Sequence, residues 1–175
     1  MRTTTRGDWA NINDSDGRIP AMWRLKRSSD LLWKCNGGDL ESAKIIKIAN
    51  VPTFERGDGV VTTLLVGRET APGCTFTSGL TSFPAGRCAP LHSHNCGEQV
   101  TLLEGEGEVE VEGQTTYLEK YDTTYIPPGN SHRFSNVGKT PLVILWIYDA
   151  TRVTRTFTDT GKTVDHLSVG DSVQP

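Results

Sequence analysis

The chain has 175 residues and a mass of 19.2 kDa, which suffices for one domain with a hydrophobic core and one or two extensions. Its 18 basic and 21 acidic residues give a net charge of −3, so we expect neither a nucleic-acid partner nor an anionic membrane surface. It contains neither the apolar segment of a secretory signal nor about 18 consecutive apolar residues, and we therefore expect a cytoplasmic protein.

The first 40 residues are rich in Arg, Asp, Asn and Ser but hold three of the four tryptophans, Trp9, Trp23 and Trp33. Large aromatic side chains in an otherwise polar segment tend to pack on a surface. Residues 1–40 are therefore predicted to be an N-terminal extension that packs on its own domain or on a partner subunit. Such an extension, beside a β-domain whose rim needs covering, predicts a homodimer.

Residues 41–150 have the pattern of an all-β domain, because short apolar or alternating segments are separated by Gly, Pro, Asn and Asp. The regular spacing predicts a double-sheet jelly-roll barrel. Segments 98–105 and 106–113 are expected to form a hairpin that turns at residues 104–106. The other predicted strands are 45–51, 60–66, 74–83, 114–122, 123–130, 132–138 and 142–149.

Residues 151–175 are rich in threonine and are predicted to be a C-terminal extension, which adds a strand to the barrel rim or to a neighbouring chain. The four cysteines form no CxxC pair, and the chain shows no secretion signal, so free thiols are expected. His166 has no partner at ligand spacing and is not expected to bind a metal.

Four side chains have a spacing that suits one metal site. His92 and His94 lie two residues apart, so both imidazoles leave the same face of an extended strand, and Glu98 follows four residues later. His132 follows a Pro-Pro-Gly turn and is expected to join them. Neutral imidazole and carboxylate suit a divalent Fe, Mn, Ni, Co, Cu or Zn ion, and the lack of thiolate ligands argues against a structural zinc site or an iron–sulfur cluster.

The same residues resemble the two motifs of the cupin superfamily. The first motif is matched at every fixed position and the second at all but its leading glycine, where Tyr121 stands. The two motifs cover roughly a fifth of the chain, and the resemblance implies a single-domain, metal-binding cupin with a double-stranded β-helix, or jelly-roll, barrel. The matching positions are Gly86, His92, His94, Glu98 and Gly105 in the first motif, and Pro127, Gly129, His132 and Asn136 in the second.

A divalent ion held by three neutral histidines and one glutamate has a formal site charge of +1 and attracts an anionic oxygen ligand. A six-coordinate ion keeps two open positions, so we expect an enzyme acting on a small keto, enol or carboxylate molecule. The resemblance allows a dioxygenase, which we favour. The alternatives are a redox-neutral isomerase, decarboxylase or lyase in which Glu98 or a cavity tyrosine moves a proton, and a barrel that binds a small molecule without turnover.

Strand parity predicts which side chains share the cavity with these ligands. Asn136 is instead expected to serve the turn at the end of its strand. The candidate substrate-pocket residues are Cys88, Val100, Leu102, Tyr125, Phe134, Trp146 and Tyr148.

Overall fold

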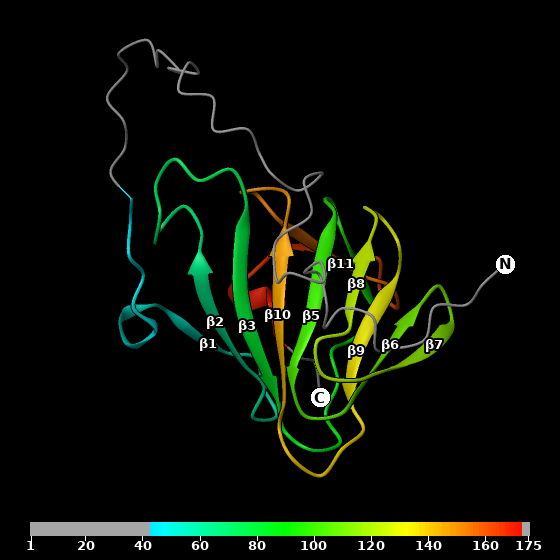
Figure 1. The fold of residues 1–175 in the computed structure, drawn as a ribbon. Coiled ribbons are helices and arrows are strands. Elements are labelled where there is room, and N and C mark those ends of the chain that lie inside the picture. Colours follow the sequence, from blue (N-terminus) through cyan, green and yellow to red (C-terminus); the bar gives the residue numbers. More distant parts are fainter. Residues whose placement is uncertain (1–42, 173–175) are drawn as a thin grey trace, which may run out of the picture. The chain divides into compact units, whose positions relative to one another are not determined.

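The structure is a computed structural model that describes residues 43–172 (Figure 1). The predicted N-terminal extension, residues 1–40, lies outside the described residues, so its packing and the homodimer stay predictions. The described chain begins with a short 3₁₀ helix, η2 (Ile48–Asn50), and ends with another, η3 (Val169–Asp171). Between them it forms strands in two antiparallel sheets, which confirms the predicted all-β jelly roll.

The first sheet has six strands in the order β1-β2-β3-β10-β5-β8 (Figure 1). All its neighbouring strands are antiparallel, and the long central pairs β3–β10 and β10–β5 form its middle. The strands are β1 (Thr53–Glu55), β2 (Val61–Val66), β3 (Thr77–Phe83), β5 (Glu98–Glu104), β8 (Thr123–Ile126) and β10 (Leu142–Tyr148).

The second sheet also has six strands, in the order β12-β11-β4-β9-β6-β7. It places β4 and β9, which carry the predicted histidines, side by side. Its strands are β4 (His92–His94), β6 (Gly107–Val111), β7 (Gln114–Leu118), β9 (His132–Asn136), β11 (Thr154–Phe157) and β12 (Thr163–Asp165).

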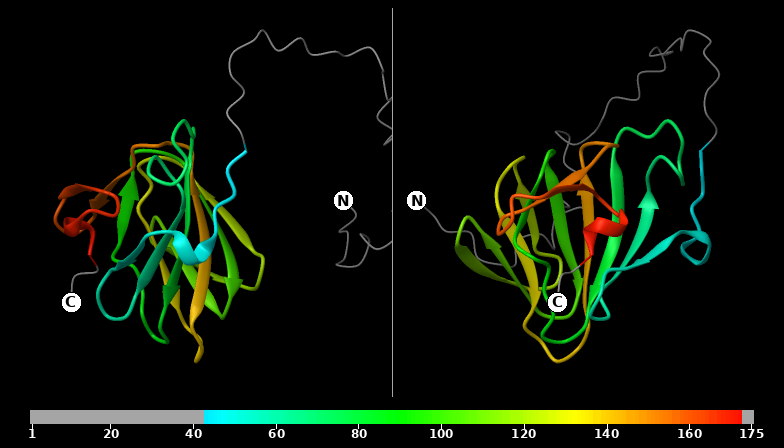
Figure 2. Two further views of the ribbon diagram at one scale, coloured as in Figure 1. Left: turned by 90° about the vertical axis from the view of Figure 1, so that its left-hand side faces the viewer. Right: turned by 180° about the vertical axis from the view of Figure 1, so that it is seen from behind.

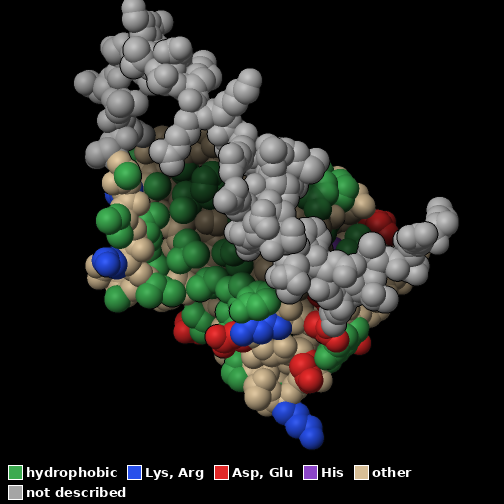
Figure 3. Space-filling model, viewed as in Figure 1, with side chains coloured by type: hydrophobic (Ala, Val, Ile, Leu, Met, Phe, Trp, Pro, Cys, Tyr) green, Lys and Arg blue, Asp and Glu red, His purple; other side chains and the backbone are tan. Residues whose placement is uncertain are grey.

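The core lies between the two sheets and follows the two-residue period of the strands. In β10, Leu142, Ile144, Trp146 and Tyr148 are buried, while the residues between them are half-buried on the outer face. Figure 3 shows hydrophobic side chains gathered on this outer face, over β2, β3 and β10. The strand therefore reads as nearly continuously apolar, although only alternate residues reach the core.

Two of the predicted local structures are wrong. β5 and β6 do not form a hairpin, because they lie in different sheets, and β6 pairs instead with β7. Gly105 turns the corner with φ +85°, and a Cβ at this position would lie 2.5 Å from the Pro141 carbonyl oxygen. Segment 45–51 is also no strand: it contains η2, and the exposed Ile45 and Ile48 point away from the core.

The segment predicted as a C-terminal extension forms part of the barrel wall. β11 pairs with β4, and its residues 155–157 lie opposite His94, Ser93 and His92. Figure 2 shows this orange and red part of the chain running against the green strands. Residues 151–172 therefore belong to the same compact unit as the strands before them, and that unit begins at Ala43.

In residues 43–172, no helix has the length and apolar character needed to cross a bilayer. The three cysteines in this part of the chain, Cys74, Cys88 and Cys96, are free thiols, as the sequence predicts.

Candidate metal centre

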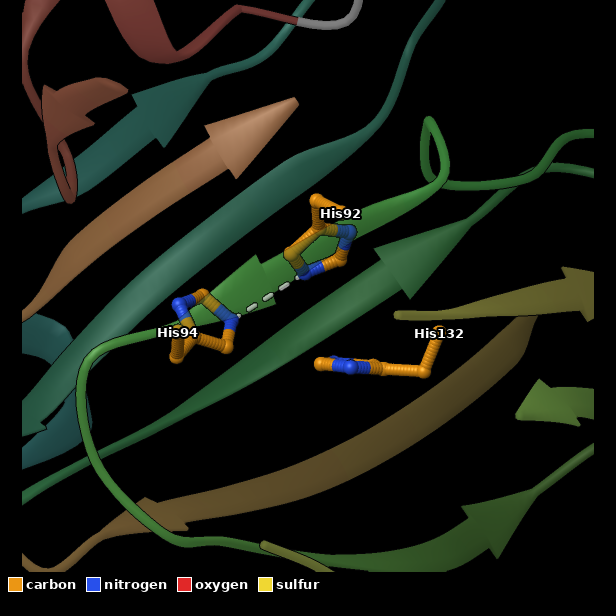
Figure 4. A group of neighbouring side chains, drawn as sticks. All are labelled: His92, His94 and His132. Atoms are coloured by element: carbon orange, nitrogen blue, oxygen red, sulfur yellow. Dashed lines mark hydrogen bonds between the residues drawn. The ribbon is translucent and has the colours of Figure 1, made fainter. Parts of the chain in front are cut away.

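Three strand ends bring the predicted ligands together inside the barrel. β4 presents His92 and His94 on one face, β9 begins at His132, and β5 begins at Glu98. His92 lies directly opposite His132 in the β4–β9 pair. All four side chains are buried, and Figure 4 shows the three imidazoles turned toward a common centre.

A backbone carbonyl fixes each of the three imidazole rings through its Nδ1 atom. Nδ1 of His92 lies 2.7 Å from the Pro90 carbonyl oxygen, and Nδ1 of His94 lies 2.9 Å from that of Thr154. Nδ1 of His132 lies 2.9 Å from the Asn130 carbonyl oxygen. Because a carbonyl only accepts hydrogen bonds, each Nδ1 carries a proton, and a neutral ring then has a bare lone pair on Nε2.

The bare Nε2 atoms converge. Nε2 of His92 lies 3.1 Å from Nε2 of His94, and the ligand atoms of the three histidines all lie within 4.8 Å of one another. Two nitrogens bound at a right angle to one ion, at about 2.1 Å each, would lie about 3.0 Å apart. Two lone pairs at this distance repel each other unless a cation lies between them. The donor set therefore fits a divalent transition metal ion.

The carboxylate of Glu98 completes the group. Its Oε2 atom lies 2.8 Å from Nε2 of His132 and 3.8 Å from Nε2 of His94. Among the described residues, neither this oxygen nor Nε2 of His132 has a hydrogen-bond partner of acceptable geometry, and both atoms are buried. Buried polar atoms of this kind are rare in native proteins without an ion or a water to satisfy them.

Burial keeps His92 and His94 neutral, whereas the neighbouring histidines keep Glu98 charged. Burial, the charge of Arg155 and the other two histidines lower the pKa of His92 well below its usual range. Burial is also the main cause that lowers the pKa of His94 to about 4, against the charge of Glu98. Burial alone would raise the pKa of Glu98, but His132 and His94 outweigh it and lower the pKa. These protonation states are the ones a metal ligand needs.

The cavity beside the four side chains encloses about 30 Å³, and His92, Glu98 and His132 line it. By this measure it holds roughly two water molecules or a ligand of similar bulk. Three of the predicted pocket residues, Phe134, Trp146 and Tyr148, also line it.

The other four predicted pocket residues lie elsewhere. Val100 and Leu102 share the inward face with Glu98 but lie farther along β5, in the hydrophobic core. Tyr125 is 69% exposed because it pairs with the outward-facing Gln99. Cys88 makes an isolated bridge to Ser135 before the regular strand begins, so the parity of β4 does not extend to it.

Three residues from both ends of the domain line the same cavity although no sequence pattern predicts them there: Arg56, Arg155 and His166. The His166 ring centroid lies 6.0 Å from that of His94 and 5.1 Å from that of Tyr148. The alternation of β11 could have marked Arg155 as inward-facing, since it has the parity of the buried Phe157. No local pattern distinguishes Arg56 or His166.

Fold and site together define a class of protein: a jelly-roll barrel whose interior holds a three-histidine group able to bind a metal ion. Residues 79–148 match the family model described as a cupin domain, which supports the predicted resemblance to the cupin superfamily. A stretch of 63 residues is 38% identical to the uncharacterized protein MJ1618 of Methanocaldococcus jannaschii. The stretch covers 35% of this chain and 50% of that protein, so the chain matches about half the length of this curated relative.

Solved structures share the fold at low sequence identity. A predicted oxalate decarboxylase from Thermotoga maritima is 22% identical and superposes with a TM-score of 0.53 over 59% of this chain and 96% of that one. KdgF from a Halomonas species is 18% identical and superposes with a TM-score of 0.52 over 62% and 94% of the respective chains. These likenesses support the cupin fold.

Proposed function

We propose that the protein is a mononuclear metal-dependent enzyme that acts on a small, oxygen-rich carboxylate, keto or enol compound. His92, His94, His132 and Glu98 are its proposed metal ligands. The observation that carries this proposal is the contact between Nε2 of His92 and Nε2 of His94 at 3.1 Å, in rings whose Nδ1 protons are both engaged by carbonyl oxygens. A bound divalent ion would supply a Lewis acid with positions open to substrate.

The remaining side chains of the cavity have defined roles in this proposal. Burial, followed by the charge of Glu98, raises the pKa of Tyr148 well above its usual range, so its hydroxyl remains a hydrogen-bond donor. That hydroxyl lies 3.1 Å from Nε2 of His94, at the edge of the proposed ligand set. Without an ion the hydroxyl donates to Nε2 of His94; an ion bound to that nitrogen would leave the hydroxyl to donate to an oxygen of the substrate, while Phe134 and Trp146 would limit the access of water.

A dioxygenase is the favoured reaction class, because an imidazole-rich ligand set with two open positions accepts a substrate oxygen and dioxygen together. Redox-neutral isomerisation, decarboxylation or elimination is the second candidate. It is supported by the Tyr148 hydroxyl and the Glu98 carboxylate, which give the cavity a proton donor and a proton acceptor. The third candidate is binding without turnover, which the small, aromatic-lined cavity supports.

The test begins with elemental analysis of protein purified without added metal. We expect one divalent transition metal ion per chain, with loss of most of it in His92→Ala and retention in His166→Gln, whose histidine lies outside the group. Full metal occupancy in His92→Ala would contradict the ligand assignment. Oxygen uptake with keto and enol acids, measured with an oxygen electrode, then separates the reaction classes: turnover without oxygen supports the redox-neutral candidate, and a ligand recovered unchanged supports binding alone.

A further inference from the structure

The cavity beside the candidate metal centre is too small for most substrates of the proposed class. Its volume of about 30 Å³ admits roughly two water molecules or a ligand of that bulk. Each strand that carries a proposed ligand, namely β4, β5 and β9, is paired on both sides. These strands cannot move apart without breaking ladder hydrogen bonds. A larger ligand therefore needs space from a part of the wall that lies outside the ladders.

His166 forms the part of the wall between this cavity and a larger hollow on the outside of the barrel. The hollow has a volume of about 800 Å³, which is typical of small-molecule sites. Among residues 43–172, His166 alone lines both spaces. Its side chain is 5% exposed, and its ring centroid lies 5.2 Å from that of Trp146 and 5.1 Å from that of Tyr148. Outward movement of this one ring would join the two spaces.

His166 begins a segment, residues 166–172, that has few backbone bonds to the barrel. β12, the strand before it, has three residues and pairs only with β11, at the edge of its sheet. Segment 166–172 belongs to no strand. Its backbone makes one hydrogen bond to the described chain before β12, from the His166 N–H to the Val153 carbonyl oxygen at 2.9 Å. Few hydrogen bonds therefore need to break for the segment to open.

One side chain, Asp171, holds segment 166–172 onto the barrel. Asp171 is fully buried, and its Oδ1 atom lies 2.7 Å from Nη2 of Arg56 and 2.8 Å from Nη1 of Arg155. Arg56 follows β1 and Arg155 lies on β11, so one carboxylate joins the segment to elements of both sheets. Oδ2 of Asp171 accepts a hydrogen bond from the Leu167 N–H at 2.8 Å, and Leu167 packs against the edge of the core.

The backbone of the segment is strained next to the ring of His166. Leu167 has φ +63°, a left-handed conformation that is unfavourable for a residue with a Cβ. Val169, in η3, is 99% exposed, so the middle of the segment gains nothing from packing. Strained segments with little buried apolar surface open locally while the rest of a domain stays folded.

We propose that residues 166–172 are a gate of the candidate metal centre, and that displacement of His166 opens the inner cavity into the outer hollow. A ligand then binds with an oxygen-bearing group at the metal and an apolar group in the hollow, which is lined by Phe54, Leu64 and Val153. His166 thus determines the size of the ligand that the site accepts. This inference rests on the proposed function, because it takes the four-residue group as the metal centre.

Hydrogen exchange tests the gate in the full-length, metal-free protein, and so without reference to the ion. A segment that opens by itself exchanges its amide protons through local openings, which expose little surface and depend little on urea. We expect the amides of His166 and Leu167 to exchange at least about a hundredfold faster than those in the middle of β10, with less dependence on urea. Equal rates with equal dependence on urea would show that the segment opens only with the whole domain, and the gate would be refuted.

Two carboxylates of different size test the role of the gate in the full-length, metal-loaded protein. Formate matches the bulk that the inner cavity admits, whereas phenylacetate has the same charge but also needs the hollow. Calorimetry gives both affinities, and metal content is determined before and after each titration. His166→Ala should raise the affinity for phenylacetate relative to that for formate at least about tenfold, because the larger ligand no longer has to displace the ring. Val169→Ala is the matched control: it alters an exposed side chain of the same segment and should leave the ratio unchanged.

An unchanged ratio in His166→Ala would overturn the inference, and so would failure of both proteins to bind phenylacetate. The unmodified protein gives an independent answer if His166→Ala does not fold. Phenylacetate should speed the hydrogen exchange of the His166 amide and formate should not, because only the larger ligand holds the gate open. If phenylacetate leaves this exchange unchanged or slows it, the segment does not open for the ligand and the inference is wrong.

Failure of the proposed function gives a different result. If elemental analysis and metal titration find no bound ion, the metal centre is refuted. Hydrogen exchange of the metal-free protein then still decides whether residues 166–172 open separately from the barrel. Local opening would keep the gate between the cavity and the hollow, whereas opening only together with β10 would refute the gate as well.

Discussion

His92 and His94 bring their Nε2 atoms to 3.1 Å while each ring holds its Nδ1 proton against a backbone carbonyl oxygen. In this arrangement the carbonyl groups determine the tautomer, and the tautomer determines which nitrogen faces the cavity. The two-residue spacing places both rings on one face of β4, but spacing alone does not orient them. The carbonyls of Pro90 and Thr154 do, and the second of these comes from the start of β11, 60 residues away in the chain.

Replacing Glu98 with glutamine should weaken metal binding without unfolding the barrel. Glutamine has nearly the same shape as glutamate, so packing is kept, but the anionic ligand oxygen is lost. We expect affinity for a divalent transition metal ion to fall at least about tenfold. Metal titration followed by calorimetry measures the change, with Glu104→Gln as control because Glu104 lies at the far, exposed end of the same strand. Equal affinity in Glu98→Gln and the unmodified protein would remove Glu98 from the ligand set.

The metal-free protein should lose stability as the pH falls from about 6.5 toward 4. Burial lowers the pKa of His92, His94 and His166 below the unfolded value of 6.5, and that of His94 to about 4. The unfolded chain therefore binds more protons in this range, so the free energy of unfolding is greatest above pH 6.5 and decreases on acidification. Each neutral buried histidine contributes a slope of about 1.4 kcal/mol per pH unit.

Thermal unfolding of chelator-treated protein between pH 8 and pH 4.5 measures this effect. The melting temperature should be nearly constant above pH 7 and fall steeply below pH 6.5. His166→Phe removes one of the three histidines whose pKa burial lowers and should reduce the slope below pH 6.5. A melting temperature that stays constant down to pH 4.5 would show that the three rings are not held neutral in the folded protein.

The grouping of the four proposed ligands could be predicted from the sequence because its information is local. An even spacing and the position after a Pro-Pro-Gly turn place His92, His94, Glu98 and His132, and the structure brings them together. Asn136 is equally local: its amide donates to the carbonyls of Phe83 and Thr140 at 2.9 and 2.8 Å and closes the turn after β9, as expected.

The meeting of Arg56, Arg155 and Asp171 at the cavity could not be predicted in the same way. Arg56, Arg155 and Asp171 meet only because β11 pairs with β4 and η3 folds back behind them. A Thr-rich segment carries no signal for either event. The apolar segment 45–51 was wrongly predicted as a strand for a related reason. Its apolar character does not show whether a partner strand exists, and in the structure Ile45 is 81% exposed.

Tyr121→Gly should stabilise the protein. Tyr121 adopts φ +74° at the position where the second cupin motif has glycine, and its side chain is 67% exposed. The turn forms nevertheless, because the Tyr121 N–H donates to the Leu102 carbonyl at 2.7 Å and the Glu119 N–H donates to the Asp122 carboxylate at 2.8 Å. Glycine removes the strain of the left-handed backbone, partly offset by its greater freedom in the unfolded chain, for a net gain of about 0.5–1 kcal/mol.

Urea denaturation measures the change in the free energy of unfolding. Tyr117→Gly is the matched control, since Tyr117 is an exposed tyrosine in β7 whose φ lies outside the left-handed region, and glycine there should destabilise the strand. If both variants are destabilised to the same extent, the contact of Lys120 with the Tyr121 ring, 5.0 Å from its centroid, outweighs the backbone strain.

Gly79→Ala should be strongly destabilising, although Gly79 lies in the middle of a regular strand. Gly79 is the strand partner of Trp146, and the indole ring lies where a side chain would otherwise be. A Cβ at this position would overlap the Trp146 ring and the Thr63 carbonyl oxygen. The indole cannot move freely, because its Nε1 donates a hydrogen bond to Thr81 Oγ1 at 3.0 Å. We expect a loss of about 1–3 kcal/mol, the range for an overpacked core.

A double-mutant cycle with Trp146→Phe tests the cause of that loss. The smaller ring leaves space for the alanine methyl group, so Gly79→Ala should cost less in the Trp146→Phe background than in the unmodified protein, by at least about 0.5 kcal/mol. Urea denaturation of the four proteins provides the cycle. Additive costs would show that the collision with Thr63, and not the position of the indole, determines the need for glycine. Trp146 also lines the cavity. Coupling between the two substitutions would therefore mean that Gly79 helps to determine the shape of the candidate site by leaving room for the indole ring.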